Sequence, residues 1–251
     1  MADLSNKVAL VTGGARDIGR AISLRLAEQG ASVIVNYFDN AEQADETVQV
    51  IKKADGKAAA IQADVTKPAD IERLVAQAIQ SFGKTIHVLI NVAGGLVARK
   101  KMDEMDELFW HTVITLNLTS AFLVTKAVLP YMADGGAIVN FSSQAARDGG
   151  GPGAIAYATA KGGVLTFTRG LAKELGPRKI RVNCVSPGMI NTTFHNTFTK
   201  PEVRQRVAAM TPLSREGEAK EVADLVAYLA SDNASFINGA SVEINGGTYF
   251  V

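Results

Sequence analysis

The sequence predicts an α/β fold, in which one doubly wound parallel sheet of about seven strands carries helices on both faces. Two observations support this prediction. Short apolar runs of strand length alternate with amphipathic segments of helix length along the whole chain, and a glycine-rich turn directly follows the first apolar run. Strands that alternate regularly with helices are typical of a parallel sheet that is covered on both sides.

The first half of the chain predicts four strands separated by three helices. Gly30 and Gly83 follow the first and third helices, because glycine readily takes the backbone conformation that ends a helix. The strands are expected at 7–12, 32–37, 58–63 and 86–91, and the helices at 18–29, 41–54 and 68–82.

The second half continues the alternation and then departs from it. Strands are expected at 137–141, 180–185 and 241–244, and helices at 112–132, 154–175 and 218–231. Residues 189–212 lack strand periodicity and are expected to form two short helices on a long excursion. Such excursions are often lids or binding loops. We expect residues 1–251 to form a single domain.

The charge distribution argues against two classes of partner. The 26 Lys and Arg residues are scattered among 25 Asp and Glu residues, and the net charge is +1. Proteins that bind nucleic acid or an anionic membrane usually carry a basic stripe or patch. We therefore expect no nucleic-acid or membrane partner. We also expect a small-molecule substrate and no metal site.

The cysteine content and the N-terminal residues favour a cytoplasmic location. Cys184, the single cysteine, lies in an apolar run, where a buried thiol behaves as a small hydrophobe; a reactive thiol is the alternative. The first residues lack the basic and apolar parts of a signal peptide, and we find no uncharged apolar run of the ~20 residues that a membrane span needs.

Tyr157 and Lys161 form the most informative pair of side chains. They lie four residues apart in a predicted helix, so both leave the same face. A nearby ammonium lowers the pKa of a phenol, which makes the tyrosine a better group for proton transfer. The same spacing also occurs by chance in surface helices. The catalytic interpretation gains weight from Ser142 and Ser143 at the end of a predicted strand, and from Asn117.

Together with the glycine turn, these residues resemble the short-chain dehydrogenase/reductase family along essentially the whole chain. The resemblance implies a Rossmann-like fold and a catalytic set of Asn117, Ser143, Tyr157 and Lys161. Serine would hold the substrate carbonyl, tyrosine would transfer the proton, and lysine would bind the nicotinamide ribose and lower the tyrosine pKa. Asn117 would hold a water on the proton path.

Two alternatives concern this set. Ser142 competes with Ser143, but neighbours in a strand point to opposite faces, and we choose Ser143. A serine nucleophile is disfavoured because no histidine is placed by sequence to activate it, although His195 could line a substrate pocket. The alternative of a nucleotide-binding protein without catalysis is disfavoured because such a protein has no need of all four residues.

The glycine turn after the first strand is a moderate signal for a bound dinucleotide. It resembles the family pattern TGxxxGxG, with Asp17 at the middle glycine, and the residues expected at the cofactor are Gly13, Arg16, Asp17, Ile18 and Gly19. A carboxylate facing the pyrophosphate would repel it. We therefore expect Asp17 to cap the first helix and to turn its charge away.

The end of the second strand favours NADP(H) over NAD(H). An acidic residue at Tyr37 would bind the ribose hydroxyls of NAD, and the chain has none there. By resemblance, Arg16 is placed to meet the 2′-phosphate of NADP. Asp39 could still serve a ribose diol, so NAD remains the alternative.

The resemblance implies further cofactor contacts along the chain. Asp64 and Val65 would bind adenine, although Asp64 would serve equally well in a turn. The fourth strand ends in a small-residue segment, in which Val92 departs from the family pattern. The remaining contacts are expected from Asn91, Ala93, Gly94, Pro187, Gly188, Ile190 and Thr192, although an ordinary turn would also explain Pro187 and Gly188.

The substrate is the least determined feature. Residues 94–100 and 142–153 look most like the subgroup that reduces 4-deoxy-5-hexoseulose uronate, a 2-keto acid of alginate degradation. The overall pattern also resembles 3-oxoacyl-carrier-protein reductases, and a sugar or alcohol dehydrogenase is a further alternative. Gln144, Arg147 and Arg99 are expected near the mouth of the site and suit an anionic sugar, although each arginine could equally be a solvated surface residue. Family members commonly pair the helices equivalent to 112–132 and 154–175, so we expect a homotetramer.

Overall fold

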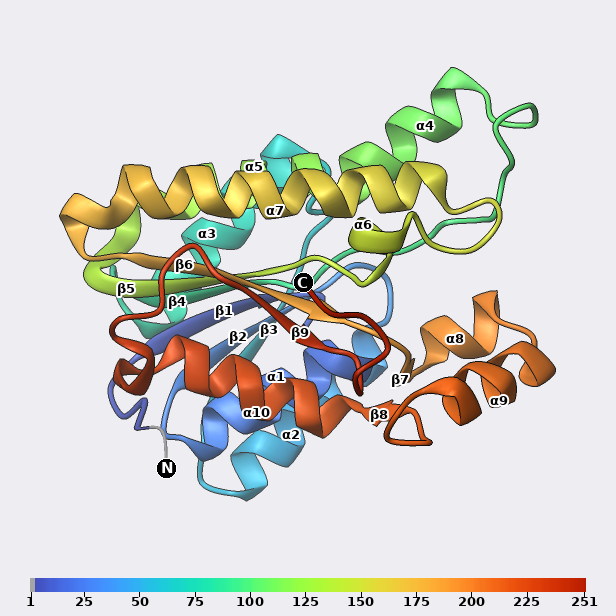
Figure 1. The fold of residues 1–251 in the computed structure, drawn as a ribbon. Helices are drawn as coiled ribbons and strands as arrows, with labels where there is room; N and C mark the ends of the chain where they lie inside the picture. Colours follow the sequence, from blue (N-terminus) through green and yellow to red (C-terminus); the bar gives the residue numbers. More distant parts are fainter. Residues whose placement is uncertain (1–2) are drawn as a thin grey trace.

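The computed structural model describes residues 3–251, and they form three layers with a parallel sheet in the middle (Figure 1). The prediction of a seven-stranded α/β fold is confirmed, because the strands run parallel in the order β3-β2-β1-β4-β5-β6-β9. Their bounds are β1 Val8–Thr12, β2 Ser32–Tyr37, β3 Lys57–Gln62, β4 Ile86–Asn91, β5 Met132–Phe141, β6 Arg181–Pro187 and β9 Ser241–Ile244.

Helices cover both faces of the sheet (Figure 1). Successive residues of a strand face opposite ways, so Leu10 of β1 enters one apolar core and Val11 enters the other. The Val11 face packs against α1 Asp17–Glu28, α2 Ala41–Lys53 and α10 Ala219–Ala230. The Leu10 face packs against α3 Pro68–Phe82, α5 Ser120–Val128 and α7 Ile155–Leu175. Cys184 of β6 is fully buried, and burial raises its thiol pKa to about 11.

The helix expected at 112–132 is longer and less regular than predicted. It begins with α4 Glu107–Ile114, widens into a π-turn η1 at Thr115–Thr119, continues as α5, and ends in the 3₁₀ turn η2 Leu129–Tyr131. By length and composition this helix could cross a membrane. In this fold it is a core helix, since Val113 packs against α7 and Val124 faces the sheet.

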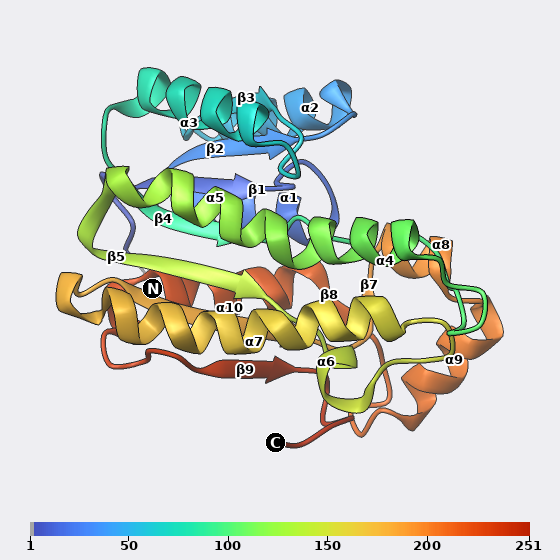
Figure 2. The same cartoon turned by 90° about the horizontal axis from the view of Figure 1, so that it is seen from above.

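The excursion forms the two short helices that the sequence predicts, α8 Thr193–Phe198 and α9 Pro201–Met210. We call residues 193–210 the lid. A two-stranded ribbon joins it to the domain, with β7 Ile190–Asn191 paired to β8 Gly217–Glu218. Neither lid helix contains a buried residue. Figure 2 shows the lid beyond the tips of the strand arrows, at the carboxyl edge of the sheet.

The strands before the predicted site residues all end at this edge. Thr12 of β1 lies beside Asn91 of β4, and Asn91 lies beside Asn140 of β5. The turn after β1, the small residues after β4 and Ser143 after β5 therefore emerge side by side. A short helix, α6 Ala145–Asp148, and two 3₁₀ turns, η3 Gly176–Arg178 and η4 Asp232–Ala234, complete the chain.

Candidate active site

The structure brings Ser143 and Tyr157 together at the carboxyl edge of the sheet. Ser143 lies just after β5, and its side chain lies close enough to the partly buried phenol of Tyr157 on α7 to lower the pKa of that phenol. Ser142 points elsewhere, because its buried hydroxyl donates to the carbonyl of Lys161 at 2.8 Å. The two serines thus separate as strand alternation requires.

Lys161 lies one turn below Tyr157 on α7, and its ammonium is buried. Its Nζ donates to the carbonyl of Phe141 at 2.8 Å and lies 5.7 Å from the centre of the Tyr157 ring. Burial lowers the pKa of Lys161 to about 8, because the charged form loses hydration.

The expected effect of Lys161 on the tyrosine pKa is not what this structure shows. Burial raises the pKa of Tyr157, and the nearby side chain of Ser143 only partly offsets that rise. The physical reason is that desolvation acts on both groups, while the ammonium is turned toward the Phe141 carbonyl. Tyr157 is therefore a protonated phenol at neutral pH.

Asn117 occupies the middle of the π-turn, a feature that often marks functional sites in helices. Its Nδ2 donates to the carbonyls of Gly95 at 2.8 Å and Val113 at 3.0 Å, and its Oδ1 accepts from the Gly95 amide at 3.0 Å. These bonds fix the loop after β4 against the helix. A Cβ at Gly94 would lie 2.7 Å from Asn117 Oδ1 and 3.2 Å from Lys161 Nζ, so only glycine fits here without displacing these two side chains.

The glycine turn after β1 forms a closely packed cradle of backbone. Gly13 has φ +64°, and a Cβ there would lie 3.3 Å from the Cα of Ala93. A Cβ at Gly19 would lie 2.0 Å from the carbonyl oxygen of Gly13. Asn36 holds the turn, since its Oδ1 and carbonyl accept from the amides of Gly13 at 3.2 Å and Gly14 at 2.8 Å. A glycine turn that follows the first strand and leads into the start of α1 fits the pyrophosphate of a nicotinamide dinucleotide.

The expectation that Asp17 caps α1 is wrong. Asp17 is itself the first residue of α1, with φ +50°, and Arg16 occupies the N-cap position. Its carboxylate accepts hydrogen bonds from the amide of Thr193, at 3.0 Å, and from the Thr193 hydroxyl. The donors that satisfy this carboxylate come from α8 of the lid, 176 residues further along the chain.

The residues predicted to select NADP lie where the sequence placed them. Arg16 is exposed beside the cradle, and within residues 3–251 no carboxylate lies within ion-pair distance of its guanidinium. Strand β2 ends at Tyr37 without an acidic residue, and Asp39 is exposed just beyond it. The preference for NADP(H) stays a prediction.

Asp64 makes the contacts of a turn residue, the alternative that the sequence left open. Its Oδ1 accepts from the Thr66 amide at 2.9 Å and from the Thr66 hydroxyl at 2.6 Å, and Lys67 Nζ lies 3.4 Å from Oδ2. Val65 is buried beside it. The adenine contact of this pair stays a prediction.

The other residues expected at the cofactor lie at the ends of β4 and β6. Asn91 is buried, and its Nδ2 donates to Thr125 and Asn140. The amide of Gly188 donates to the carbonyl of Ile244 at 3.0 Å, and the Thr192 hydroxyl donates to the carbonyl of Ile190 at 3.1 Å. Thr192 directly precedes the lid.

The guanidinium of Arg147 is not free to bind a substrate carboxylate, as we had expected it to be. Its Nε and Nη2 both donate to Glu243 Oε1, at 3.2 and 3.1 Å, and both side chains are largely buried. This ion pair ties α6 to β9, so the guanidinium already has its carboxylate. Gln144 likewise donates to Asp148 at 2.9 Å.

Arg99 bridges two loops at the mouth of the site. Its Nε donates to the carbonyl of Phe198 in the lid at 3.2 Å, and its Nη1 donates to the carbonyl of Pro152 at 3.0 Å. Both acceptors are neutral. Arg99 therefore keeps an uncompensated positive charge, unlike Arg147.

Phe194 is a site residue that the sequence did not reveal. Its ring centre lies 6.1 Å from that of Tyr157 and 5.1 Å from that of Phe198, so α8 places an aromatic surface beside Tyr157. Its sequence carries no local signal for this position, because the contact depends on how the lid folds back over the sheet edge.

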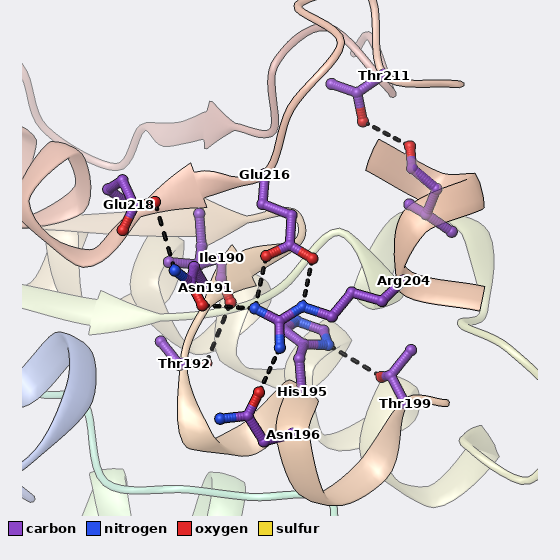
Figure 3. Close-up of polar contacts among 11 residues, drawn as sticks. Ile190, Asn191, Thr192, His195, Asn196, Thr199, Arg204, Thr211, Glu216 and Glu218 are labelled. Atoms are coloured by element: carbon purple, nitrogen blue, oxygen red, sulfur yellow. Dashed lines mark hydrogen bonds and ion pairs between the residues drawn. The ribbon is translucent and has the colours of Figure 1, made fainter. Parts of the chain in front are cut away.

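A second unexpected residue, Arg204 of α9, organises the lid (Figure 3). Its guanidinium donates to both carboxylate oxygens of Glu216, and also to the amide oxygens of Asn191 and Asn196. His195 lies against this group, with Nδ1 3.0 Å from the Thr199 hydroxyl. Burial, together with the charge of Arg204, lowers the His195 pKa to about 4, so the ring is neutral at physiological pH.

Comparison with known proteins agrees with this geometry. A family model described as enoyl-(acyl carrier protein) reductase matches residues 13–249. A 3-oxoacyl-[acyl-carrier-protein] reductase from Staphylococcus epidermidis is 38% identical over 246 residues, which cover 97% of this chain and 99% of the relative.

Two solved structures are also similar. A short-chain dehydrogenase/reductase from Serratia marcescens superposes with a TM-score of 0.92 at 35% identity, covering 97% of this chain and 98% of the other. A blue fluorescent protein from a metagenomic library, in complex with NADPH, has a TM-score of 0.93 at 35% identity, covering 99% of this chain and 100% of the other.

The fold, the site and these likenesses define the protein as an oxidoreductase. The chain belongs to the short-chain dehydrogenase/reductase family, whose likeness extends over nearly its whole length.

Proposed function

We propose that the protein is an NADPH-dependent carbonyl reductase whose substrate is a small anionic keto sugar acid such as 4-deoxy-5-hexoseulose uronate. One observation carries the reaction class: Ser143, Tyr157, Lys161 and Asn117 converge beside a backbone cradle that fits a dinucleotide. When bound, the nicotinamide ring supplies the hydride for the substrate carbonyl carbon.

The chain supplies the proton and the orientation. The Ser143 hydroxyl donates to the carbonyl oxygen and holds it near the phenol, and Tyr157 gives that oxygen its proton. Burial raises the pKa of Tyr157, so the phenol carries its proton at neutral pH and is ready for the reductive direction. Lys161 remains mostly charged below its pKa of about 8 and can stabilise the phenolate that forms.

Lys161 and Asn117 also define the route by which the proton is replaced. Both side chains lie close to Gly94, so a water bound by them would connect the Asn117 loop with the ammonium. This part of the proposal follows the family resemblance. The contacts of Asn117 with Gly95 and Val113 support it, because they hold the Asn117 side chain in place.

Arg99 supports an anionic substrate. Its Nε and Nη1 are held by neutral carbonyls, and within residues 3–251 no protein acceptor engages its Nη2. A guanidinium that is oriented but not neutralised can bind a carboxylate. Phe194 adds an apolar surface over the site, against which the carbon face of a sugar can pack.

The second candidate is a 3-oxoacyl-carrier-protein reductase, which the name of the Staphylococcus relative favours. A screen that follows oxidation of NADPH and NADH separates the two functions. The expected result is a higher kcat/KM for keto sugar acids than for acetoacetyl thioesters and for neutral sugars or aldehydes. A preference for thioesters over every keto acid would replace the sugar-acid proposal with the carrier-protein one.

The proposal includes a cytoplasmic homotetramer. Leu108 and Phe122 are exposed on the α4–α5 helix, and Phe122 packs edge-on against Phe167 of α7. An apolar face formed by these two helices suits the pairing that the family resemblance implies. Light scattering that gives the monomer mass of 26.5 kDa would rule the tetramer out, and cell fractionation tests the location.

A further inference from the structure

Asp17 is a carboxylate in the turn where the dinucleotide pyrophosphate is expected, and the mechanism does not use it. It has φ +50°, a conformation that glycine adopts without cost and aspartate adopts with some strain. Both donors to its carboxylate come from Thr193, the first residue of the lid. Its partner is thus the element that covers the site.

Few contacts hold the lid against the rest of the domain. Neither α8 nor α9 contains a fully buried residue, and the aromatic contact across the site is that of Phe194 with Tyr157, so few contacts must break for the lid to open. The ion pair of Arg204 with Glu216 and its hydrogen bond to Asn191 join α9 to the segments at the base of the lid (Figure 3). The polar contacts that cross to the other wall of the site include the hydrogen bonds that Thr193 donates to Asp17 and the one that Arg99 donates to Phe198.

We propose that Asp17 is a positioning residue that couples closure of the lid to binding of the dinucleotide. With the lid closed, the amide and hydroxyl of Thr193 donate to the carboxylate and hold it pointing toward α8. With the lid open, the same carboxylate stands without these donors in the pyrophosphate cradle and repels the cofactor. Cofactor binding therefore favours the closed lid, and loss of the Thr193 contact weakens cofactor binding.

This inference rests on the dinucleotide binding in the proposed function, so one arm of the test omits the cofactor. In that arm, chymotrypsin cleavage after Phe194 or Phe198 reports lid opening. We expect Asp17→Gly and Thr193→Val to be cleaved roughly three to ten times faster than the wild type, the range that loss of a typical hydrogen bond at an exposed site allows. Thr197→Val is the matched control, because Thr197 lies in the same helix and bonds only to the carbonyl of Thr193.

The second arm measures the Kd of NADPH by fluorescence titration in a double-mutant cycle. Thr193→Val should raise the Kd roughly three- to tenfold in the presence of Asp17 and less than about twofold in the Asp17→Gly background, where there is no charge left to expose. Asp17→Asn keeps an acceptor but no charge, and it should likewise make the Kd insensitive to Thr193→Val. Melting temperatures show that each variant is folded.

The outcomes are distinguishable. If Thr193→Val changes the Kd equally with and without Asp17, or if lid cleavage is the same in Asp17→Gly as in the wild type, the coupling is absent. If the wild type binds neither NADPH nor NADH, the proposed function fails, while the cleavage arm still decides whether Asp17 holds the lid.

Discussion

Helix α7 and the lid differ in what holds them in place. α7 has 21 residues and packs against the sheet, and its Tyr157 packs in an apolar cluster with Phe109 and Ala156. The lid helices contain no fully buried residue, and besides the contact of Phe194 with Tyr157 they are held by charges and amides, with Arg204 at the centre. The fold thus positions the groups that we propose to transfer the proton, whereas polar contacts largely position the lid.

This difference predicts two kinds of mutational effect. Substitutions at α7 should alter the chemical step and leave binding nearly intact. Substitutions at the mouth and lid should alter binding or selectivity and leave the chemical step able to proceed. The four predictions below test this division, from the largest expected effect to the smallest.

Tyr157→Phe should abolish turnover with little change in cofactor Kd. The variant keeps the ring that packs near Phe194 but removes the proton that the carbonyl oxygen receives. General acid catalysis contributes about 10²- to 10⁴-fold, so kcat should fall by at least that range. Steady-state kinetics with parallel cofactor titration measures both quantities. A variant that kept more than about a tenth of kcat would show that Tyr157 is not the proton donor.

Arg99→Ala should lower kcat/KM for a keto sugar acid by roughly 10- to 150-fold, because a charge-assisted bond to the carboxylate is lost. A neutral aldehyde has no carboxylate and should be nearly unaffected. Arg147→Ala is the matched control: its guanidinium pairs with Glu243, so we expect a lower melting temperature and an unchanged ratio of acid to aldehyde. Equal selectivity in all three proteins would contradict the substrate proposal.

The third prediction is a decline of kcat/KM at alkaline pH. The pKa of Lys161 is lowered to about 8 by burial, so the ammonium is present below that pH and is lost as pH rises through it. Since the charged form is the one that stabilises the phenolate, the slope should approach about tenfold per pH unit. A pH–rate profile between 6 and 10, as approximate limits, checks this, because kcat/KM reports the free enzyme. A flat profile would remove Lys161 from the chemical step.

Arg16→Ala should weaken NADPH binding roughly two- to fivefold and leave NADH binding almost unchanged, since an exposed ionic contact contributes about 1 kcal/mol or less. The wild type should prefer NADPH, because β2 ends at Tyr37 without a carboxylate. Comparison of kcat/KM for both reduced cofactors in both proteins is the measurement. Equal losses for both cofactors would mean that Arg16 does not meet the 2′-phosphate.

The sequence predicted the fold and the proximity of Tyr157 and Lys161 better than it predicted the contacts at the mouth of the site, while the catalytic roles of these residues stay predictions. Strand and helix periods are local, so nearly every element of the sheet was found, and Ser143 was distinguished from Ser142 by strand alternation. The contacts that the side chains of Asp17, Arg147 and Arg204 make are with residues 176, 96 and 12 positions away in the sequence. Their roles follow from how the lid and β9 fold back, and no local pattern encodes that.

The raised pKa of Tyr157 was missed for a related reason. Helical spacing correctly put Lys161 on the same face, but it carried no information about how deeply the two groups would be buried. Desolvation is the main cause of the shift, and only Ser143 opposes it. Sequence spacing predicts proximity, whereas the sign of a pKa shift depends on the surrounding packing.

The π-turn at Thr115–Thr119 inserts one extra residue into the helix. This residue determines the direction in which the side chains of α5 point relative to those of α4. On its N-terminal side Val113 faces α7, and on its C-terminal side Val124 faces the sheet. Each residue of an α-helix advances the direction of its side chain by about 100°, so deletion of one residue here would rotate one segment against the other by that angle. The deletion would turn either Val113 or Val124 toward solvent, and we expect it to lower the melting temperature as well as displace Asn117. The chain length within this one turn is therefore as much a part of the site as the identity of Asn117.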